Sequence, residues 1–444
     1  MATIDLSQVG PQQAAFFATL GQAYPLPANT AQYPLSAGQF YGQVATNCRL
    51  VNAKAGTNKG ISARNHHRAR GAITEIAMVL SNWYVERSAS KLEYPNNAGA
   101  ICAASVEYPA GTFHRLNFDG AVRELIQGGS YRVSAFVSVS IPDNAEFWTN
   151  IWLSAATSIV FFNGSTGQVT ANGEKGTVST GDVTDYTMAS HTGTAQSYGL
   201  WPLALIGRTS SKATAILSDS VGEGVGDASD TTDHVGMLAR FVGPACPYIN
   251  LSQSGDRLEL LLQSPSRRLA LLTYARNAVL GMGVNDIGAG RSLEQIKADM
   301  IELWSKARDH ISAGGRLFQA TITPSTTSTD SFATLANQAP ANNFSTAGNG
   351  TREQLNDWLR DGAPLQGAAA AEIGTAEALR AAGDGSHPLH AILDMADAVE
   401  SARNSGKWRV DGTAFKWTID GIHPSNYAHM QAATAAAPYL ALFA

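Results

Sequence analysis

The sequence is poor in cysteine and in charge. Only three cysteines occur in 444 residues, and the spacing of Cys48, Cys102 and Cys246 gives neither a disulfide framework nor a set of metal ligands, although one disulfide could form. Charged residues make up 15% of the chain and the net charge is −5, so no basic face for nucleic acid is expected. The densest basic stretch, 64–70, is short, and we expect it to be a solvated loop.

Long apolar runs and a targeting signal are also missing. No apolar run reaches about 18 residues, so no membrane span is predicted. The first residues, Met1-Ala-Thr-Ile-Asp, lack the basic and then apolar segments that mark a signal peptide. A cytoplasmic protein and the mature form of a secreted protein both fit this beginning, and no pattern indicates an oligomeric state.

Length and pattern together predict two domains. At roughly 100–200 residues per domain, 444 residues suit two, and the pattern changes near residues 200–212. Residues 1–205 contain short β-like segments separated by Gly, Asn and Asp turns, which predicts a β-rich, sandwich-like accessory domain. A helix over 72–81 is expected to pack against it. The expected strands are 100–106, 112–118, 131–141 and 148–162.

Residues 206–444 alternate between strand-like and helix-like segments, which predicts a parallel sheet with helices on both faces. Active sites in such sheets lie beyond the carboxyl ends of the strands. Residues 323–350 are rich in Ser, Thr and Asn and are expected to form a long surface loop, either functional or mobile. The expected strands are 213–217, 247–251, 277–282 and 317–322, and the expected helices are 292–310, 351–360, 368–382 and 424–442.

Ser220 follows the first of these strands and comes just before a glycine-containing helix start. A serine in this place is accessible to a substrate, and the helix start offers free N–H groups to a developing anion. The alternative is that Ser220 simply caps the helix.

Three further segments have the residue types that such a serine would need. Asp420 and His423 are close enough on a turn for the carboxylate to hold the imidazole of a general base, although an ordinary surface turn fits too. The Asn285 amide could bind an oxyanion or close an Asx-turn. Gly255 could bring its backbone N–H to a ligand or serve as a common turn glycine.

Together these segments resemble the motifs of the SGNH, or GDSL-like, hydrolases. The motifs are Ser218-Asp219-Ser220, Gly255, Gly283-Val284-Asn285-Asp286 and Asp420-Gly-Ile-His423, in that order. The resemblance covers residues 212–444 and implies a flavodoxin-like three-layer α/β/α domain with a parallel sheet. Ser218 departs from the family pattern, which has glycine there, so we expect a modest change in the turn. The N-terminal β-rich region lies outside the family's core.

The resemblance also implies a role for each site residue. Ser220, His423 and Asp420 would form a catalytic triad of nucleophile, general base and orienting carboxylate. The Ser220 and Gly255 backbone N–H groups and the Asn285 side chain would form the oxyanion hole. Neither a metal nor an organic cofactor is implied.

Other patterns for chemical sites are absent or incomplete. The sequence has no Gly-x-Ser-x-Gly elbow, no Walker A loop and no His-Glu-x-x-His. His387 and His390 have a spacing that could suit a metal, but no third ligand is near and Pro388 lies between them, so no metal site is expected. His429 is expected to be a surface or packing residue.

The leading prediction is a serine ester hydrolase that removes acetyl or other acyl groups from a polysaccharide. Aromatic residues of the β-rich region could stack on sugars, although packing in the core is the alternative. A general short-chain esterase or lipase is a second reading. A third, of another class, is a non-catalytic glycan-binding or adhesin-like structural protein on an inactive hydrolase scaffold, against which the complete motif set argues. The aromatic residues in question are Trp83, Tyr84, Trp148, Trp152 and Trp201.

Overall fold

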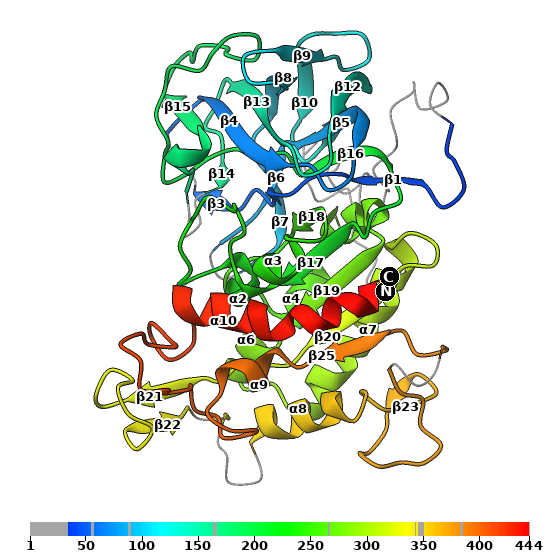
Figure 1. Ribbon diagram of the computed structural model, residues 1–444, viewed down its shortest axis with the longest axis vertical. Coiled ribbons are helices and arrows are strands. Elements are labelled where there is room, and N and C mark those ends of the chain that lie inside the picture. The colour runs from blue at the N-terminus through cyan, green and yellow to red at the C-terminus, as the bar shows by residue number, and fades with distance from the viewer. Residues whose placement is uncertain are drawn as a thin grey trace, which may run out of the picture.

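The computed structural model describes residues 34–443 except 55–56, 88–89, 163–166, 265–266, 342, 345–349 and 382–384. Within these residues a β-rich N-terminal region lies against a C-terminal α/β region (Figure 1). No helix of the described part combines the length and the apolar character that crossing a membrane requires.

The C-terminal region is built on a parallel sheet with the strand order β2-β18-β17-β19-β20-β25. From β18 to β25 this is the flavodoxin-like order 2-1-3-4-5, and its switch point lies beside β17, the first strand of the region. The predicted α/β fold is therefore confirmed. The strands are β17 (Thr214–Ser218), β18 (Tyr248–Asn250), β19 (Asn277–Gly281), β20 (Arg316–Ala320) and β25 (Ala391–Leu393).

Helices cover both faces of this sheet because its strands are apolar on both sides. In β17, Ala215 and Leu217 belong to one buried cluster and Ile216 to another. Such continuous burial is typical of strands in a three-layer α/β/α domain. The first face is covered by α4 (Leu258–Gln263), α5 (Arg267–Ala270), α7 (Leu293–His310) and α8 (Thr351–Arg360), and the second by α3 (Met237–Val242), α9 (Met395–Val399) and α10 (Asn426–Ala436).

The N-terminal region is a sandwich of two antiparallel sheets, as predicted. Its core lies between the sheets and includes Met78, Ala104 and Ile151. One sheet contains β1 (Phe40–Gln43), β16 (Ala204–Thr209), β5 (Ile73–Ser81), β11 (Tyr131–Val133) and β12 (Val137–Ile141). The other contains β10 (Glu124–Gln127), β8 (Gly99–Glu107), β9 (Phe113–Leu116), β13 (Glu146–Ala155), β4 (Gly60–Arg68) and β15 (Lys175–Ser179).

Two predictions for this region were wrong. The expected helix over 72–81 is strand β5, which is buried along almost its whole length because apolar groups pack against both of its faces. The expected solvated loop over 64–70 is largely strand β4, which lies between β13 and β15 and buries His66 and His67.

The expected helix over 368–382 also differs from the structure, and the disulfide that the sequence left possible does not form. In the described part of 368–382 the chain forms strand β24 (Ala369–Ala370) and turns, with Gly374 at φ +78. Alanine-rich composition without a buried apolar stripe does not sustain a helix. The three cysteines are free and buried, so no disulfide forms.

The expected long loop over 323–350 contains a hairpin. Strand β21 (Thr326–Ser328) pairs with β22 (Gln338–Pro340). The Thr326 N–H donates to the Gly421 carbonyl at 2.9 Å. This hairpin therefore lies against the segment that contains Asp420 and His423.

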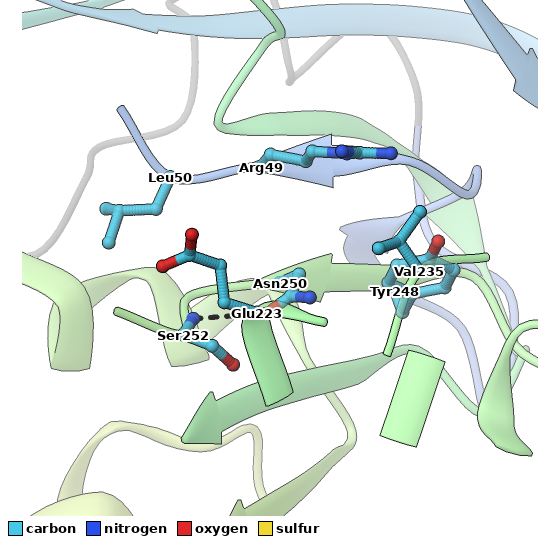
Figure 2. Close-up of a pocket in the computed structure, with 7 residues that line it drawn as sticks. All are labelled: Arg49, Leu50, Glu223, Val235, Tyr248, Asn250 and Ser252. Atoms are coloured by element: carbon cyan, nitrogen blue, oxygen red, sulfur yellow. Dashed lines mark hydrogen bonds between the residues drawn. The ribbon is translucent and has the colours of Figure 1, made fainter. Parts of the chain in front are cut away.

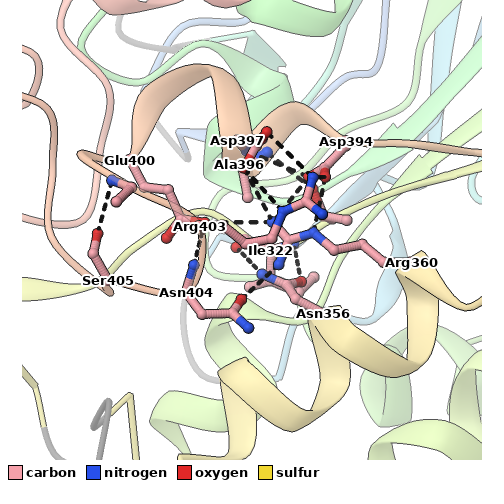
Figure 3. A network of polar contacts seen from close by, with 12 residues as sticks. Ile322, Asn356, Arg360, Asp394, Ala396, Asp397, Glu400, Arg403, Asn404 and Ser405 are labelled. Atoms are coloured by element: carbon pink, nitrogen blue, oxygen red, sulfur yellow. Dashed lines mark hydrogen bonds and ion pairs between the residues drawn. The ribbon is translucent and has the colours of Figure 1, made fainter. Parts of the chain in front are cut away.

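A polar network between α8 and α9 fixes the chain beyond β20 (Figure 3). The Asn356 side chain both accepts from the Ile322 N–H at 2.8 Å and donates to its carbonyl at 2.9 Å. Arg360 pairs with Asp394 at 2.8 Å and with Glu400 at 3.3 Å. The network holds α8 to the end of the sheet, next to the start of the β21–β22 hairpin.

The two regions share structure at their junction. Strand β2 (Cys48–Arg49), from the N-terminal half, adds to the parallel sheet by pairing with β18. A second link is the hairpin of β6 (Trp83–Val85) and β7 (Glu93–Pro95), which pairs with Glu223 of the helix after β17 and with Arg268 of α5. We propose that residues 1–205 and 206–444 are two domains and that these contacts join them.

Candidate active site

Ser220 is the first residue of the short helix α2 (Ser220–Glu223), directly beyond β17. The side chain of the preceding Asp219 accepts the Val221 N–H at 2.9 Å and so caps the helix. Asp219 therefore has the capping role that the sequence suggested as the alternative for Ser220. Because backbone N–H groups in the first turn have no partner within the helix, the one at Ser220 is suited to bind an anion.

His423 joins Ser220 to Asp420. Its Nε2 atom lies 2.9 Å from Ser220 Oγ, and its Nδ1 atom lies 2.7 Å from Asp420 Oδ2. With the ring proton on Nδ1, the imidazole donates to the carboxylate and accepts from the serine hydroxyl. The three predicted triad residues are thus brought together in the order that a serine nucleophile requires.

The Asp420 carboxylate is prepared to remain ionised. Burial alone would raise its pKa, but hydrogen bonds from the His423 backbone N–H at 2.8 Å, the His423 imidazole and the Ile422 N–H at 2.9 Å hold the pKa below its ordinary value. An ionised carboxylate at this place orients the imidazole and stabilises its protonated form.

The segment that bears Asp420 and His423 is held from several sides. The Trp408 indole N–H donates to the Gly421 carbonyl at 2.7 Å, and the Thr418 hydroxyl donates to the His423 carbonyl at 2.7 Å. Gly421 has φ +92, and a Cβ atom there would lie 2.0 Å from the Thr326 carbonyl oxygen. Only glycine fits this close approach without a shift of the chain.

The two other predicted oxyanion residues lie together on adjacent loops. Gly255 follows β18 with φ +74, and Asn285 lies in the first turn of α6 (Val284–Gly288), beyond β19. The Asn285 side chain donates to the carbonyl of Asp256, the neighbour of Gly255, at 3.0 Å. The Glu223 carboxylate of α2 accepts the Ser254 N–H at 2.6 Å, which ties this loop to the helix that begins at Ser220.

Three buried carboxyl groups, those of Asp219, Asp256 and Asp286, directly adjoin Ser220, Gly255 and Asn285 in the sequence. Burial raises the pKa of Asp219 to about 7 despite the hydrogen bond from Val221, and the nearby Asp286 and Asp256 raise it further. Burial likewise raises the pKa of Asp286 to about 7, against the hydrogen bond that it accepts from the Leu258 N–H at 3.0 Å. These groups shape the turns rather than contact Ser220 through any hydrogen bond.

Ser218, the departure from the family pattern, has a structural role of its own. It is buried, and its hydroxyl donates to the Gly281 carbonyl at 2.8 Å. The added side chain therefore ties the end of β17 to the end of β19, with the turn at Ser220 still formed.

Several other sequence candidates lie elsewhere. Among the aromatic residues, Trp83, Trp152 and Trp201 are buried, so these rings pack in the interior. His429 is also buried, and it accepts the Met237 N–H at 2.9 Å through Nδ1. His387 uses both ring nitrogens on backbone groups, the Ala363 carbonyl at 2.9 Å and the Leu389 N–H at 3.0 Å.

Sequence reasoning missed the groups that support the site. Glu223, Arg268 and Trp408 are buried or nearly so, and each contacts one of the site loops. The sequence offered one signal, Glu223, which lies between two glycines directly after the Ser220 motif. A charged side chain in such a place needs a partner, because buried glutamates are almost always paired.

This arrangement is suited to acyl transfer. A serine hydroxyl within reach of a base, a carboxylate behind that base and N–H donors at two neighbouring strand ends together provide a nucleophile, proton transfer and stabilisation of an oxyanion.

Comparisons with known proteins agree with the motifs. The model of the GDSL-like Lipase/Acylhydrolase family matches residues 219–430, which confirms the resemblance. Among solved structures, the chain is similar to a member of the lipolytic protein G-D-S-L family from Veillonella parvula, with 13% identity, 52% of this chain and 98% of that chain covered, and a TM-score of 0.33. A GDSL-like lipase from Bacteroides thetaiotaomicron has 13% identity, with 52% and 89% covered and a TM-score of 0.31. The salicylyl-acyltransferase SsfX3 from a tetracycline biosynthetic pathway has 12% identity, with 86% and 81% covered and a TM-score of 0.33. No curated protein sequence matches the chain.

Proposed function

Because residues 219–430 belong to the GDSL-like lipase/acylhydrolase family, we propose that the protein is a serine ester hydrolase with Ser220, His423 and Asp420 as its triad. The observation that carries the proposal is the chain of contacts from Asp420 Oδ2 to His423 Nδ1 at 2.7 Å and from His423 Nε2 to Ser220 Oγ at 2.9 Å. A binding protein on an inactive scaffold would have no need of this alignment.

In the proposed reaction His423 Nε2 takes the proton of Ser220 as Oγ forms a bond to the ester carbonyl carbon. The carbonyl electrons move to oxygen, and the Ser220 and Gly255 N–H groups and the Asn285 amide bind that anion. The oxyanion then collapses, the alcohol leaves with the proton from His423, and an acyl-serine remains. Water attacks the acyl-serine by the same route and releases the acid and Ser220.

We propose an acylated carbohydrate as the leading substrate. Support comes from Tyr84 and Tyr94 of the β6–β7 hairpin, whose ring centroids are 6.3 Å apart and whose loop reaches Gly255. Tyr94 is 36% exposed, and in this proposal its ring stacks on a sugar ring of the substrate.

A short-chain esterase or lipase is the second candidate. Three large apolar side chains near the triad segment are exposed, namely Phe415 at 63%, Ile419 at 53% and Ile422 at 38%. An acyl chain bound beside His423 would cover such groups.

The deciding experiment measures hydrolysis of p-nitrophenyl acetate, butyrate and octanoate and release of acetate from acetylated polysaccharides, with Ser220→Ala as the control. Acetate release from a glycan by the wild type alone supports the carbohydrate esterase, and preference for the longer nitrophenyl esters supports the second candidate. If neither substrate set is cleaved and Ser220 does not react with a fluorophosphonate, the hydrolase proposal is wrong.

A further inference from the structure

The loop that bears Gly255 is bound on both sides by Glu223 and Arg268, and each of these pairs with a side chain of the N-terminal region. These side chains come from the β6–β7 hairpin, which precedes the family-matched residues 219–430. The hairpin also contacts Gly255 itself, since a Cβ atom at Gly255 would lie 3.0 Å from Cε and Nζ of Lys91. An element outside the hydrolase core thus borders the expected oxyanion hole.

The first tether runs through Glu223, three residues after Ser220 in α2. Its Oε2 atom accepts the Ser254 N–H at 2.6 Å, and its Oε1 atom lies 2.9 Å from Arg87 Nη1. In Figure 2 the Glu223 carboxylate points away from its helix toward the side of Leu50, which belongs to the N-terminal half. The Glu223 side chain is 3% exposed, and the pair with Arg87 therefore offsets the cost of its burial.

The second tether runs through Arg268, which is fully buried in α5. Arg268 lies 3.4 Å from Glu93 and also donates to the Asp256 carboxylate. Glu93 further accepts the backbone N–H groups of Arg267 at 2.9 Å and of Arg268 at 3.1 Å. Since the Asp256 carbonyl accepts from Asn285, this tether fixes Gly255 and Asn285 through one residue.

We propose that Arg87 and Glu93 are positioning residues for the oxyanion hole, so that the N-terminal region forms part of the catalytic machinery. The inference rests on the proposed function. Oxyanion donors accelerate a reaction only when they are held in place before charge develops. The two tethers hold the residues on either side of Gly255, Ser254 and Asp256, and therefore fix the direction of the Gly255 N–H.

Arg87 is the better residue to test, because its side chain is 29% exposed whereas Glu93 is fully buried and its loss threatens folding. The variants are Arg87→Met, which keeps the length without the charge, and Arg87→Lys, which keeps the charge. Arg132→Met is the matched control, since Arg132 is 31% exposed and pairs with Glu124 within the N-terminal region at 3.1 Å.

Two readouts are needed. The first is the second-order rate of Ser220 modification by a fluorophosphonate, in which charge develops on an oxygen that the oxyanion hole binds. The second is hydrogen–deuterium exchange of the peptide over residues 251–258, which needs no activity. We expect Arg87→Met to react about tenfold more slowly, Arg87→Lys to recover part of the rate, and Arg132→Met to match the wild type. Exchange over 251–258 should rise in Arg87→Met alone.

A cycle with Asn285→Ala separates positioning from general stability. If Arg87 acts through the oxyanion hole, the Arg87→Met/Asn285→Ala double variant should react with the fluorophosphonate at a rate within about twofold of Asn285→Ala alone. The reason is that both substitutions weaken the same oxyanion hole. If the rate loss of the double variant equals the product of the two single losses, the inference is contradicted. An Arg87→Met rate equal to that of the wild type would contradict it as well. If wild-type Ser220 does not react with the fluorophosphonate at all, the proposed function fails and this inference fails with it.

Discussion

Within the described part of the chain, the Asn285 amide donates one hydrogen to the Asp256 carbonyl, and in the proposed reaction its other hydrogen binds the oxyanion. The bond holds the amide in one orientation, as an oxyanion donor requires. Replacing Asn285 with alanine should therefore lower kcat by about 10²–10³-fold, with a smaller change in KM.

Steady-state kinetics on the best nitrophenyl ester would measure this loss. Asn96→Ala is a matched control, because the Asn96 amide donates to the Val160 carbonyl at 2.9 Å within the N-terminal region. Equal activity of Asn285→Ala and the control would remove Asn285 from the oxyanion hole.

Asp219 makes stability depend on pH. Its pKa is raised to about 7 in the folded protein, so the unfolded chain loses this proton at a lower pH than the folded chain does. The stability that the neutral carboxyl contributes is therefore present at low pH and is lost as the pH rises through about 7. With about 1.4 kcal/mol per pKa unit, the free energy of unfolding should fall by about 2–3 kcal/mol between about pH 5 and about pH 8 through this group.

Asp219→Asn keeps the acceptor for the Val221 N–H and removes the ionisation. Urea unfolding at the two pH values should then show a smaller fall in stability for the variant than for the wild type. The same fall in both proteins would show that Asp219 titrates normally.

At the scale of the elements, the β21–β22 hairpin and the segment with Asp420 and His423 fit together at Gly421. Gly421→Ala would place a Cβ atom against the Thr326 carbonyl, so the segment must move and the distance from His423 to Ser220 must change. We expect a loss of kcat of about 10²-fold, the order that a displacement of about 1 Å produces.

Gly412→Ala separates this contact from backbone strain. Gly412 has φ +79, but a Cβ atom there would meet nothing within 4 Å. This variant should lose about 1–2 kcal/mol of stability from the left-handed conformation and keep its activity. Similar kinetics for the two variants would mean that the hairpin does not position the triad.

The sequence predicted those elements whose local signals agree with their packing. Helix α7 has a Ser292–Gln295 capping box and a buried stripe that includes Ile296 and Trp304, and it was predicted within one residue. Strand β5 was mistaken for a helix because Ala77, Met78 and Leu80 are good helix formers. Only burial between two layers, which depends on distant segments, overrides that preference.

The candidate site was predictable to a similar degree, and for a similar reason. Ser220, Asn285 and His423 lie in short motifs at strand ends or just before the last helix, and the strand order brings these ends together. Arg87 and Glu93 have no motif, and their contacts join residues more than a hundred positions apart, so no local pattern could reveal them.

At the scale of the whole molecule, the two regions share a hydrophobic core. One buried cluster contains Trp83, Phe136 and Ile206 from the N-terminal region together with Leu217 and Ile249 from the C-terminal region. Strand β2 crosses the junction by pairing with β18, and His66 of the sandwich contacts Asp233 of the α/β region. Unfolding either region alone would expose the apolar face of the other.

We therefore expect the chain to unfold in one cooperative step, although a chain of this length commonly unfolds in several. The eight tryptophans are divided equally between 1–205 and 206–444, so their fluorescence in a urea series reports both regions. Fluorophosphonate reactivity at Ser220 reports the site alone. The two probes should lose their signals at the same urea concentration, since loss of the sandwich removes both tethers of the Gly255 loop. A first fluorescence transition that leaves Ser220 reactive would show that the two regions are independent and that the hydrolase region keeps its site without the β6–β7 hairpin.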